Sequence, residues 1–245
     1  MLKVELHTHT ADDPVDRIPH TTLELIDRAA ALGYDALAIT LHEQQLDLGR
    51  FAPYAADRGL VLIPGVERTI EGRHVLLLNF KSGTEDVRTF GDLTRLRSRQ
   101  RALVIAPHPF FPGSVCLRGD LERHANLFDA VERNAMFTRG VDFNRRAERW
   151  AARHGKPVVG NCDVHRLRQL AAWTPPPLSP GEGRKSTQPG NNVPRQGDSL
   201  REARTATVAV KDLESAVSVI RVVSGCEARL RLAMARILKE SRVRC

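Results

Sequence analysis

The chain of 245 residues is poor in cysteine and in aromatic side chains. Its four cysteines form no Cys-x-x-Cys pair, which argues against a thiolate zinc site and indicates a reducing, cytoplasmic location. Aromatic residues make up only 5% of the chain, so no stacking surface for single-stranded nucleic acid is indicated. No apolar run approaches the length of a membrane span, and no signal peptide is recognisable. We therefore expect a cytoplasmic protein without a membrane partner.

Positive charge is in excess but is unevenly distributed along the chain. The formal net charge is +8, yet residues 1–173 contribute only +2, from 24 basic and 22 acidic groups. A groove that follows a nucleic-acid backbone needs basic residues around the site itself. The arginines between residues 95 and 101 are typical of the solvated end of a helix. Nucleic acid is therefore a possible partner that the charge distribution does not favour.

Apolar runs typical of strands alternate with segments of helical spacing over the first two thirds of the chain. The strand-like runs are residues 3–6, 36–40, 60–63, 75–80, 103–106, 129–132 and 157–160. The helix-like segments are residues 22–32, with Thr22 as the expected cap, 51–58, 85–100, 119–126 and 140–153. Such alternation predicts a largely parallel α/β sheet or barrel.

Residues that can bind metal follow these apolar runs. His7 and His9 come after the first run, and side chains two apart in an extended segment share a face, so both imidazoles can contact one ion. The later runs lead to His42, Glu67, His108, Asp163 and His165. The carboxyl ends of parallel strands meet at one rim, where active sites of α/β proteins form. The sequence therefore predicts that these residues converge in a metal cluster.

The ordered set of motifs resembles the PHP family, named for its polymerase-associated and histidinol phosphatase members. The motifs are His7-Thr8-His9-Thr10, Thr40-Leu41-His42, Gly65-Val66-Glu67, Arg73-His74-Val75-Leu76, Pro107-His108-Pro109 and Asn161-Cys162-Asp163-Val164-His165. The resemblance covers residues 2–173 and resumes near residue 205. It implies a distorted (β/α)7 barrel with the metal site at the carboxyl ends of the strands.

The same resemblance implies two or three divalent ions with shared ligands. The ligands of the first would be His7, His9, Glu67 and Asp163, and those of the second Glu67, His74 and His108. The ligands of the third would be His42, His165 and an acid of the next loop, for which Asp13 is expected, with Asp12, Asp16 and His20 as alternatives. Imidazole and carboxylate ligands suit Zn²⁺, Mn²⁺ or Fe²⁺ and do not select among them.

The activity implied is that of a metal-dependent phosphoric ester hydrolase. Metal-activated water would hydrolyse a small phosphorylated metabolite or nucleotide, with catalytic roles for Glu67, Asp163 and His165. Phe110 follows the His-Pro pair where family phosphatases often carry arginine. The substrate phosphate is therefore expected to bind elsewhere, at Arg68, Arg118 or Arg166.

Three other functions stay open at this point. Amidohydrolases also begin a barrel with His-x-His, but this chain has no lysine at a predicted strand end and finishes with Asp163-x-His165. A PHP nuclease would keep the same metal ligands. A binding module whose metal site has lost catalysis is the non-enzymatic alternative. No oligomeric state is indicated.

The last third of the chain differs in composition. Residues 174–204 are rich in Pro, Gly and polar residues, which predicts a disordered insertion. A strand at 205–210 and a helix at 212–224 would complete a single barrel domain of residues 1–224. Residues 225–245 are predicted to form a basic C-terminal helix, with helical spacing from 227 to 244.

Overall fold

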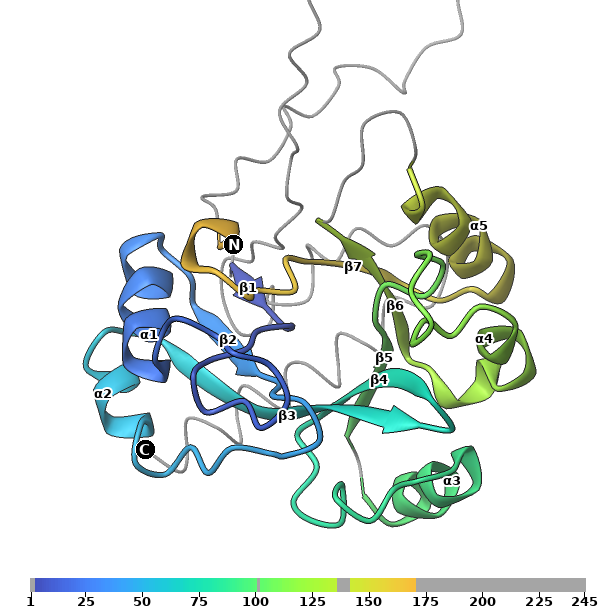
Figure 1. Cartoon of the computed structure of the whole chain (residues 1–245), viewed down its shortest axis with the longest axis horizontal. Helices are drawn as coiled ribbons and strands as arrows, with labels where there is room; N and C mark the ends of the chain where they lie inside the picture. The colour runs from blue at the N-terminus through green and yellow to red at the C-terminus, as the bar shows by residue number, and fades with distance from the viewer. Residues whose placement is uncertain (1–2, 101, 136–141, 171–245) are drawn as a thin grey trace, which may run out of the picture.

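The structure is a computed structural model that describes residues 3–100, 102–135 and 142–170 (Figure 1). The strands are β1 (Val4–Glu5), β2 (Ala36–Ile39), β3 (Val61–Ile70), β4 (Arg73–Leu78), β5 (Leu103–Ala106), β6 (Ala130–Asn134) and β7 (Val158–Asn161). The α-helices are α1 (Thr22–Ala31), α2 (Ala52–Ala56), α3 (Phe90–Arg99), α4 (Gly119–Arg123) and α5 (Asn144–His154). Two short 3₁₀ segments are η1 (Ala125–Leu127) and η2 (Leu167–Gln169).

The seven strands form one sheet in chain order. Neighbouring strands are parallel except around β4, which is antiparallel to both β3 and β5. Beyond the two edge strands, an isolated parallel bridge joins Thr8 to Val164, and the His9 N–H donates to the Val164 carbonyl at 3.0 Å. The sheet is therefore a nearly closed barrel, and the predicted α/β barrel is confirmed.

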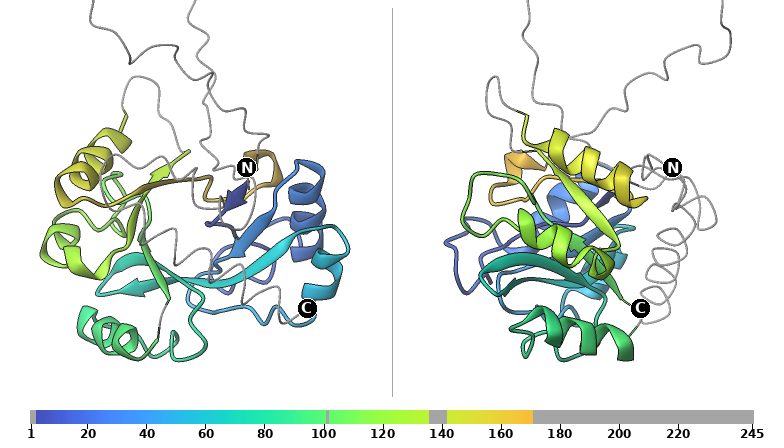
Figure 2. Two further views of the ribbon diagram at one scale, coloured as in Figure 1. Left: turned by 180° about the vertical axis from the view of Figure 1, so that it is seen from behind. Right: turned by 90° about the vertical axis from the view of Figure 1, so that its right-hand side faces the viewer.

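The helices cover the outside of this sheet. Helices α1 and α2 lie together beside β2 and β3, whereas α4 and α5 lie beside β6, as both views show (Figures 1 and 2). One buried apolar cluster contains Leu25 of α1 and Leu37 of β2, and a second contains Phe90 of α3 and Trp150 of α5. Packing on the outer face keeps the helices away from the carboxyl ends of the strands, where the loops carry the polar side chains.

Several element boundaries differ from the sequence predictions for local reasons. Thr21, not Thr22, is the N-cap of α1, because its side chain accepts the Glu24 N–H while the Glu24 carboxylate accepts the Thr21 N–H. The third helix begins at Phe90 rather than at residue 85, because Thr89 forms the same capping box with Asp92. Strand β3 continues to Ile70, well past the predicted end at residue 63, because it pairs with β4 in a hairpin.

The predictions for the last third of the chain lie outside the described residues. These are the insertion at 174–204, the strand at 205–210, the helix at 212–224 and the C-terminal helix. The division into residues 1–224 and 225–245 stays a prediction. Among the residues that are described, no helix is long and apolar enough to cross a bilayer.

Candidate metal centre

The candidate ligands come from six places on the barrel and converge at one rim. His7 and His9 follow β1, His42 follows β2, Glu67 lies within β3, His74 lies within β4, His108 follows β5, and Asp163 and His165 follow β7. Glu67 is held beside His42 by a parallel bridge, and its N–H donates to the Leu41 carbonyl at 3.0 Å. Glu67 was expected to follow its strand but lies within β3, because this strand continues into a hairpin with β4, which carries His74.

Glu67 is the centre of the cluster and is only 1% exposed. Its Oε2 atom lies 3.2 Å from His7 Nε2, 3.3 Å from His9 Nε2 and 3.2 Å from His42 Nε2. Its Oε1 atom lies 2.8 Å from His74 Nδ1 and 3.2 Å from His108 Nε2. The two oxygens of one buried carboxylate therefore face two different groups of imidazoles, an arrangement that suits a carboxylate bridging two ions.

Asp163 completes the group around Oε2. Its Oδ1 atom lies 3.3 Å from His7 Nε2 and 3.5 Å from His9 Nε2. His7 Nε2, His9 Nε2 and Asp163 Oδ1 are buried and have no hydrogen-bond partner. The ligand atoms of His7, His9, Glu67 and Asp163 all lie within 4.8 Å of one another. Because unpaired buried polar atoms are costly, atoms left unpaired and facing one another fit a cation between them.

The Asp13 carboxylate contacts the imidazole rings of His9 and His42 on the side that faces away from Glu67. Its Oδ2 atom is 2.9 Å from His9 Nδ1 and 3.0 Å from His42 Nδ1, the ring nitrogens that face away from Glu67. Its Oδ1 atom accepts the N–H groups of Val15 and Asp16 at 2.9 Å each. The carboxylate is thus engaged by protein donors. Asp16 is placed differently, with Oδ2 at 3.2 Å from His165 Nε2.

Burial and charge act against each other in the cluster. Burial disfavours a charge on His9, but the carboxylates of Asp13, Asp163 and Glu67 outweigh it and raise the pKa of His9 to about 10. Burial is likewise outweighed at His42, where Asp13 and Glu67 raise the pKa to about 9. Burial would raise the pKa of Glu67, but the imidazoles around it, His7 first, hold it well below its usual range. The cluster therefore holds either protons or metal cations near its carboxylates.

Two of the candidate ligands have unusual backbone geometry. His108 has a φ of +28° and Asp163 a φ of +50°, in a region that residues other than glycine seldom adopt. Such conformations cost free energy and occur most often at functional sites. Each residue lies two positions after the end of a barrel strand, so the turn in the chain directs its side chain toward the centre of the rim.

Known proteins share this fold. A family model described as PHP-associated matches residues 142–174. A two-domain protein from Bacteroides vulgatus containing a predicted PHP-like metal-dependent phosphoesterase aligns with a TM-score of 0.54 and 20% identity; the match covers 69% of this chain and 53% of that one. A protein from Bifidobacterium adolescentis named as a metal-dependent phosphoesterase aligns with a TM-score of 0.54, at 15% identity over 67% of this chain and 88% of that one. The chain therefore has the fold of proteins named as PHP-like or metal-dependent phosphoesterases.

A further solved structure carries a different name. An amidohydrolase from Chromobacterium violaceum with bound sulfate aligns with a TM-score of 0.52, at 17% identity over 66% of this chain and 87% of that one. The chain thus spans about half of the first of these structures and most of the other two. A search of curated proteins gives no match to the sequence. At these identities the structural likeness shows the fold alone, and the reaction has to be inferred from the residues of this chain.

The three arginines predicted to bind substrate have different surroundings in the structure. Arg68 is 2% exposed, and its guanidinium donates to the carbonyls of Val87 and Glu85 and to the Glu43 side chain. It holds the loop after β2 against the loop before α3. Arg118 is exposed and donates to the Pro112 carbonyl at 2.8 Å, and Arg166 is exposed directly after His165.

Sequence reasoning missed one buried carboxylate beside the candidate ligands. Glu132 of β6 is fully buried, and its Oε1 atom lies 2.9 Å from His7 Nδ1. The sequence places it only in a strand-like run, since a glutamate inside such a run carries no ligand motif of its own. The signal that could have found it is the presence of a charged residue among apolar neighbours at a position facing the barrel interior.

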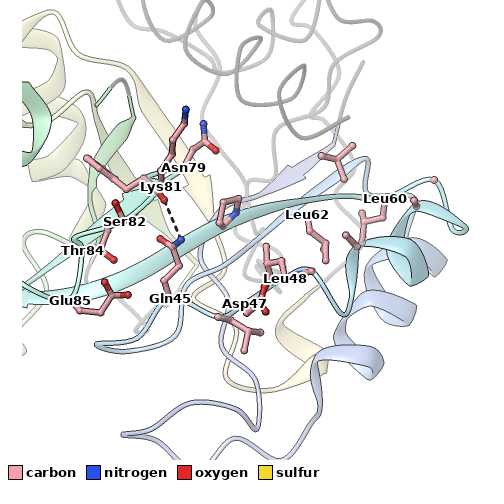
Figure 3. Close-up of a pocket in the computed structure, with 18 residues that line it drawn as sticks. Gln45, Asp47, Leu48, Leu60, Leu62, Asn79, Lys81, Ser82, Thr84 and Glu85 are labelled. Carbon is pink, nitrogen blue, oxygen red and sulfur yellow. Dashed lines mark hydrogen bonds between the residues drawn. The ribbon is translucent and has the colours of Figure 1, made fainter. Parts of the chain in front are cut away.

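A pocket of about 780 Å³ lies away from the candidate metal centre. It is formed by the loop after β2, the first half of β3 and the loop after β4 (Figure 3). Leu60 and Leu62 line one part of it and Lys81 and Glu85 another, and the Gln45 amide donates to the Phe80 carbonyl at 3.2 Å. None of the candidate metal ligands lines this pocket.

Proposed function

We propose that this PHP domain is a metal-dependent phosphoesterase that hydrolyses a small phosphorylated metabolite or nucleotide. The observation that carries the proposal is the Glu67 carboxylate, whose two oxygens face two separate groups of imidazoles. A buried bridging carboxylate surrounded by histidines is typical of sites that hold two divalent ions. Two of the three proteins compared above, those from Bacteroides vulgatus and Bifidobacterium adolescentis, carry names of this class of hydrolase.

The contacts support a ligand set for each ion. We assign His7, His9, Asp163 and Glu67 to one ion, and Glu67, His74 and His108 to a second. A third ion would take His42 and His165. Of the acids expected for it, Asp16 has the better placed oxygen, because both oxygens of Asp13 contact protein donors. Zn²⁺, Mn²⁺ and Fe²⁺ all accept these ligands.

Divalent ions at these sites would supply Lewis acidity, which activates water and offsets charge on phosphoryl oxygens. The protein residues then position the reacting groups. Glu67 keeps the two ligand sets on opposite sides of one carboxylate. Asp163 contacts His165 Nδ1 at 3.3 Å, and His165 is more exposed than the other imidazoles of the centre. In a two-ion form, in which His165 Nε2 is not a metal ligand, we assign to His165 the transfer of a proton to the leaving oxygen.

Recognition of the phosphate falls to Arg118 and Arg166 in this proposal. Both side chains are exposed, and they extend from loops that follow His108 and His165. Arg68 is excluded from this role by its burial and by its contacts with Glu43, Glu85 and Val87. An exposed guanidinium can bind phosphate with two parallel hydrogen bonds, which a buried and already paired one cannot.

The test is a substrate panel on chelator-treated protein reconstituted separately with Mn²⁺, Zn²⁺ and Fe²⁺. The panel contains phosphate monoesters of metabolites and nucleotides, oligonucleotides, and cyclic amides. We expect phosphate release from monoesters only with metal present. Turnover confined to amides would identify an amidohydrolase, turnover confined to oligonucleotides a nuclease, and no turnover with any metal a binding module. Each of these three results would contradict the proposal.

A further inference from the structure

The two ring nitrogens of His7 have different surroundings. Nε2 faces the Glu67 and Asp163 carboxylates at 3.2 and 3.3 Å and has no hydrogen-bond partner. Nδ1 lies 2.9 Å from Glu132 Oε1 on the opposite side of the ring. The ring is fully buried and has no surface exposed to solvent. Which nitrogen carries the proton decides whether Nε2 has a lone pair to offer a cation.

Glu132 is itself held in place by two donors. Its Oε2 atom accepts the His108 backbone N–H at 2.7 Å and the Asn134 side-chain N–H at 3.1 Å. Glu132 and Asn134 are two apart on β6, so their side chains share the face of the strand that points into the barrel. One carboxylate oxygen therefore receives two protein donors while the other faces His7.

This arrangement decides which nitrogen carries the proton when the His7 ring is neutral. An ionised carboxylate can only accept hydrogen bonds, so the Nδ1 atom of His7 must be the donor toward Glu132. A neutral imidazole with its proton on Nδ1 has its lone pair on Nε2, toward Glu67 and Asp163. Partners of this kind orient metal-binding histidines and increase the basicity of the ligand nitrogen.

We propose that Glu132 is a positioning residue that fixes His7 as the Nδ1-protonated tautomer and thereby makes Nε2 a metal ligand. The same carboxylate holds the backbone of His108, a ligand assigned to the second ion, so Glu132 supports both ligand groups around Glu67. The inference rests on the metal centre of the proposed function, but it does not depend on the substrate. It gives a role in metal binding to Glu132, a residue outside the proposed ligand sets.

Glu132→Gln is a sharp test because it changes the hydrogen-bonding pattern with little change in shape. The His108 N–H and the Asn134 amide both donate to the same position, so the oxygen of the new side-chain amide must occupy it. The NH₂ group of that amide then faces His7 Nδ1, which has to accept, and the ring proton moves to Nε2. We expect the affinity for Mn²⁺, measured by competition with a chelating dye, to fall about 10- to 100-fold.

Glu5→Gln is the matched control. Glu5 is also fully buried in the barrel, but its Oε1 atom accepts backbone N–H groups from His7 at 3.2 Å and Cys162 at 3.1 Å. A glutamine oxygen at that position satisfies both amides and leaves the His7 ring unchanged. We expect wild-type affinity for Mn²⁺. Equal affinity in wild-type protein and the Glu132 variant would overturn the proposal, and so would an equal loss in both variants.

A measurement on the unaltered protein covers the case in which the Glu132 variant does not fold. Nitrogen-15 NMR of histidine in the Zn²⁺-loaded protein distinguishes a protonated ring nitrogen from a metal-bound one. We expect the His7 proton on Nδ1; a proton on Nε2 would overturn the proposal. Metal binding that persists without phosphatase activity would contradict the proposed function alone, whereas wild-type protein that binds no divalent ion would contradict both.

Discussion

At the scale of single residues, the proposed metal centre depends most on the charge of Glu67. Glu67→Gln keeps the shape of the side chain but removes the charge that both imidazole groups face. We expect the metal content to fall together with hydrolysis, and kcat/KM to decrease by more than about 100-fold, because a lost ligand costs at least as much as a lost supporting contact. Metal analysis and a phosphatase assay check this. Glu71→Gln, an exposed glutamate on the turn after β3, is the control and should keep full activity.

A second residue-level prediction concerns pH. His9 and His42 have pKa values of about 10 and about 9 in the folded metal-free protein, above the ordinary 6.5. Protonated imidazoles therefore stabilise the fold fully below about pH 6.5, and this contribution is lost as the pH rises to about 10. We expect the free energy of unfolding of chelator-treated protein, measured with urea, to decrease over that range. A free energy that stays level or increases would show that these imidazoles do not carry the charge assigned to them.

Individual residues also show what the sequence could and could not predict. His7 and His9 were predictable as a pair, because alternation along an extended segment places them on one face. The positions of Asp13 and Arg68 were not predictable, because both depend on contacts between loops. Such contacts place the Asp13 carboxylate against the Nδ1 atoms of His9 and His42, and they bury the Arg68 guanidinium. Glu132 gave no motif at all, and its role follows only from its distance to His7.

At the scale of elements, the pattern of apolar residues predicted the β3–β4 hairpin least well. The predicted runs at 60–63 and 75–80 correspond to real strands, but the segment between them was not predicted to be paired. Period-two alternation is weak where both faces of a strand are buried, as they are over most of β3. The strand at 103–106, by contrast, was predicted with its observed limits, because its four residues are all apolar and it lies in the sheet interior.

Gly65 on β3 gives a prediction about how this hairpin packs. A Cβ atom at this position would lie 2.7 Å from Leu78 Cδ2 and 2.8 Å from Thr40 Cγ2. We expect Gly65→Ala to lower the free energy of unfolding in urea by about 1–3 kcal/mol through overpacking. Gly91→Ala in α3 adds the same methyl group where its nearest contacts are 3.5 and 3.7 Å away. That control should be neutral or stabilising, and a Gly65 variant as stable as the control would disprove the packing argument.

At the scale of the whole molecule, all the candidate ligands lie between His7 and His165, so the barrel brings together residues almost 160 positions apart. The Pro- and Gly-rich segment at 174–204 follows the last of them. We expect deletion of residues 174–204 to leave the metal content per chain unchanged, as measured by elemental analysis of the purified variant. A variant that no longer folds, or that folds without metal, would assign this segment a structural role that its composition does not predict.

The most direct test of the central claim is an anomalous diffraction experiment on crystals of Mn²⁺-loaded protein. We expect two anomalous peaks, one on each side of the Glu67 carboxylate. One should lie next to His7, His9 and Asp163, and the other next to His74 and His108. Crystals grown with Mn²⁺ that show no peak within coordination distance of Glu67 would contradict the metal centre and the phosphoesterase activity proposed from it.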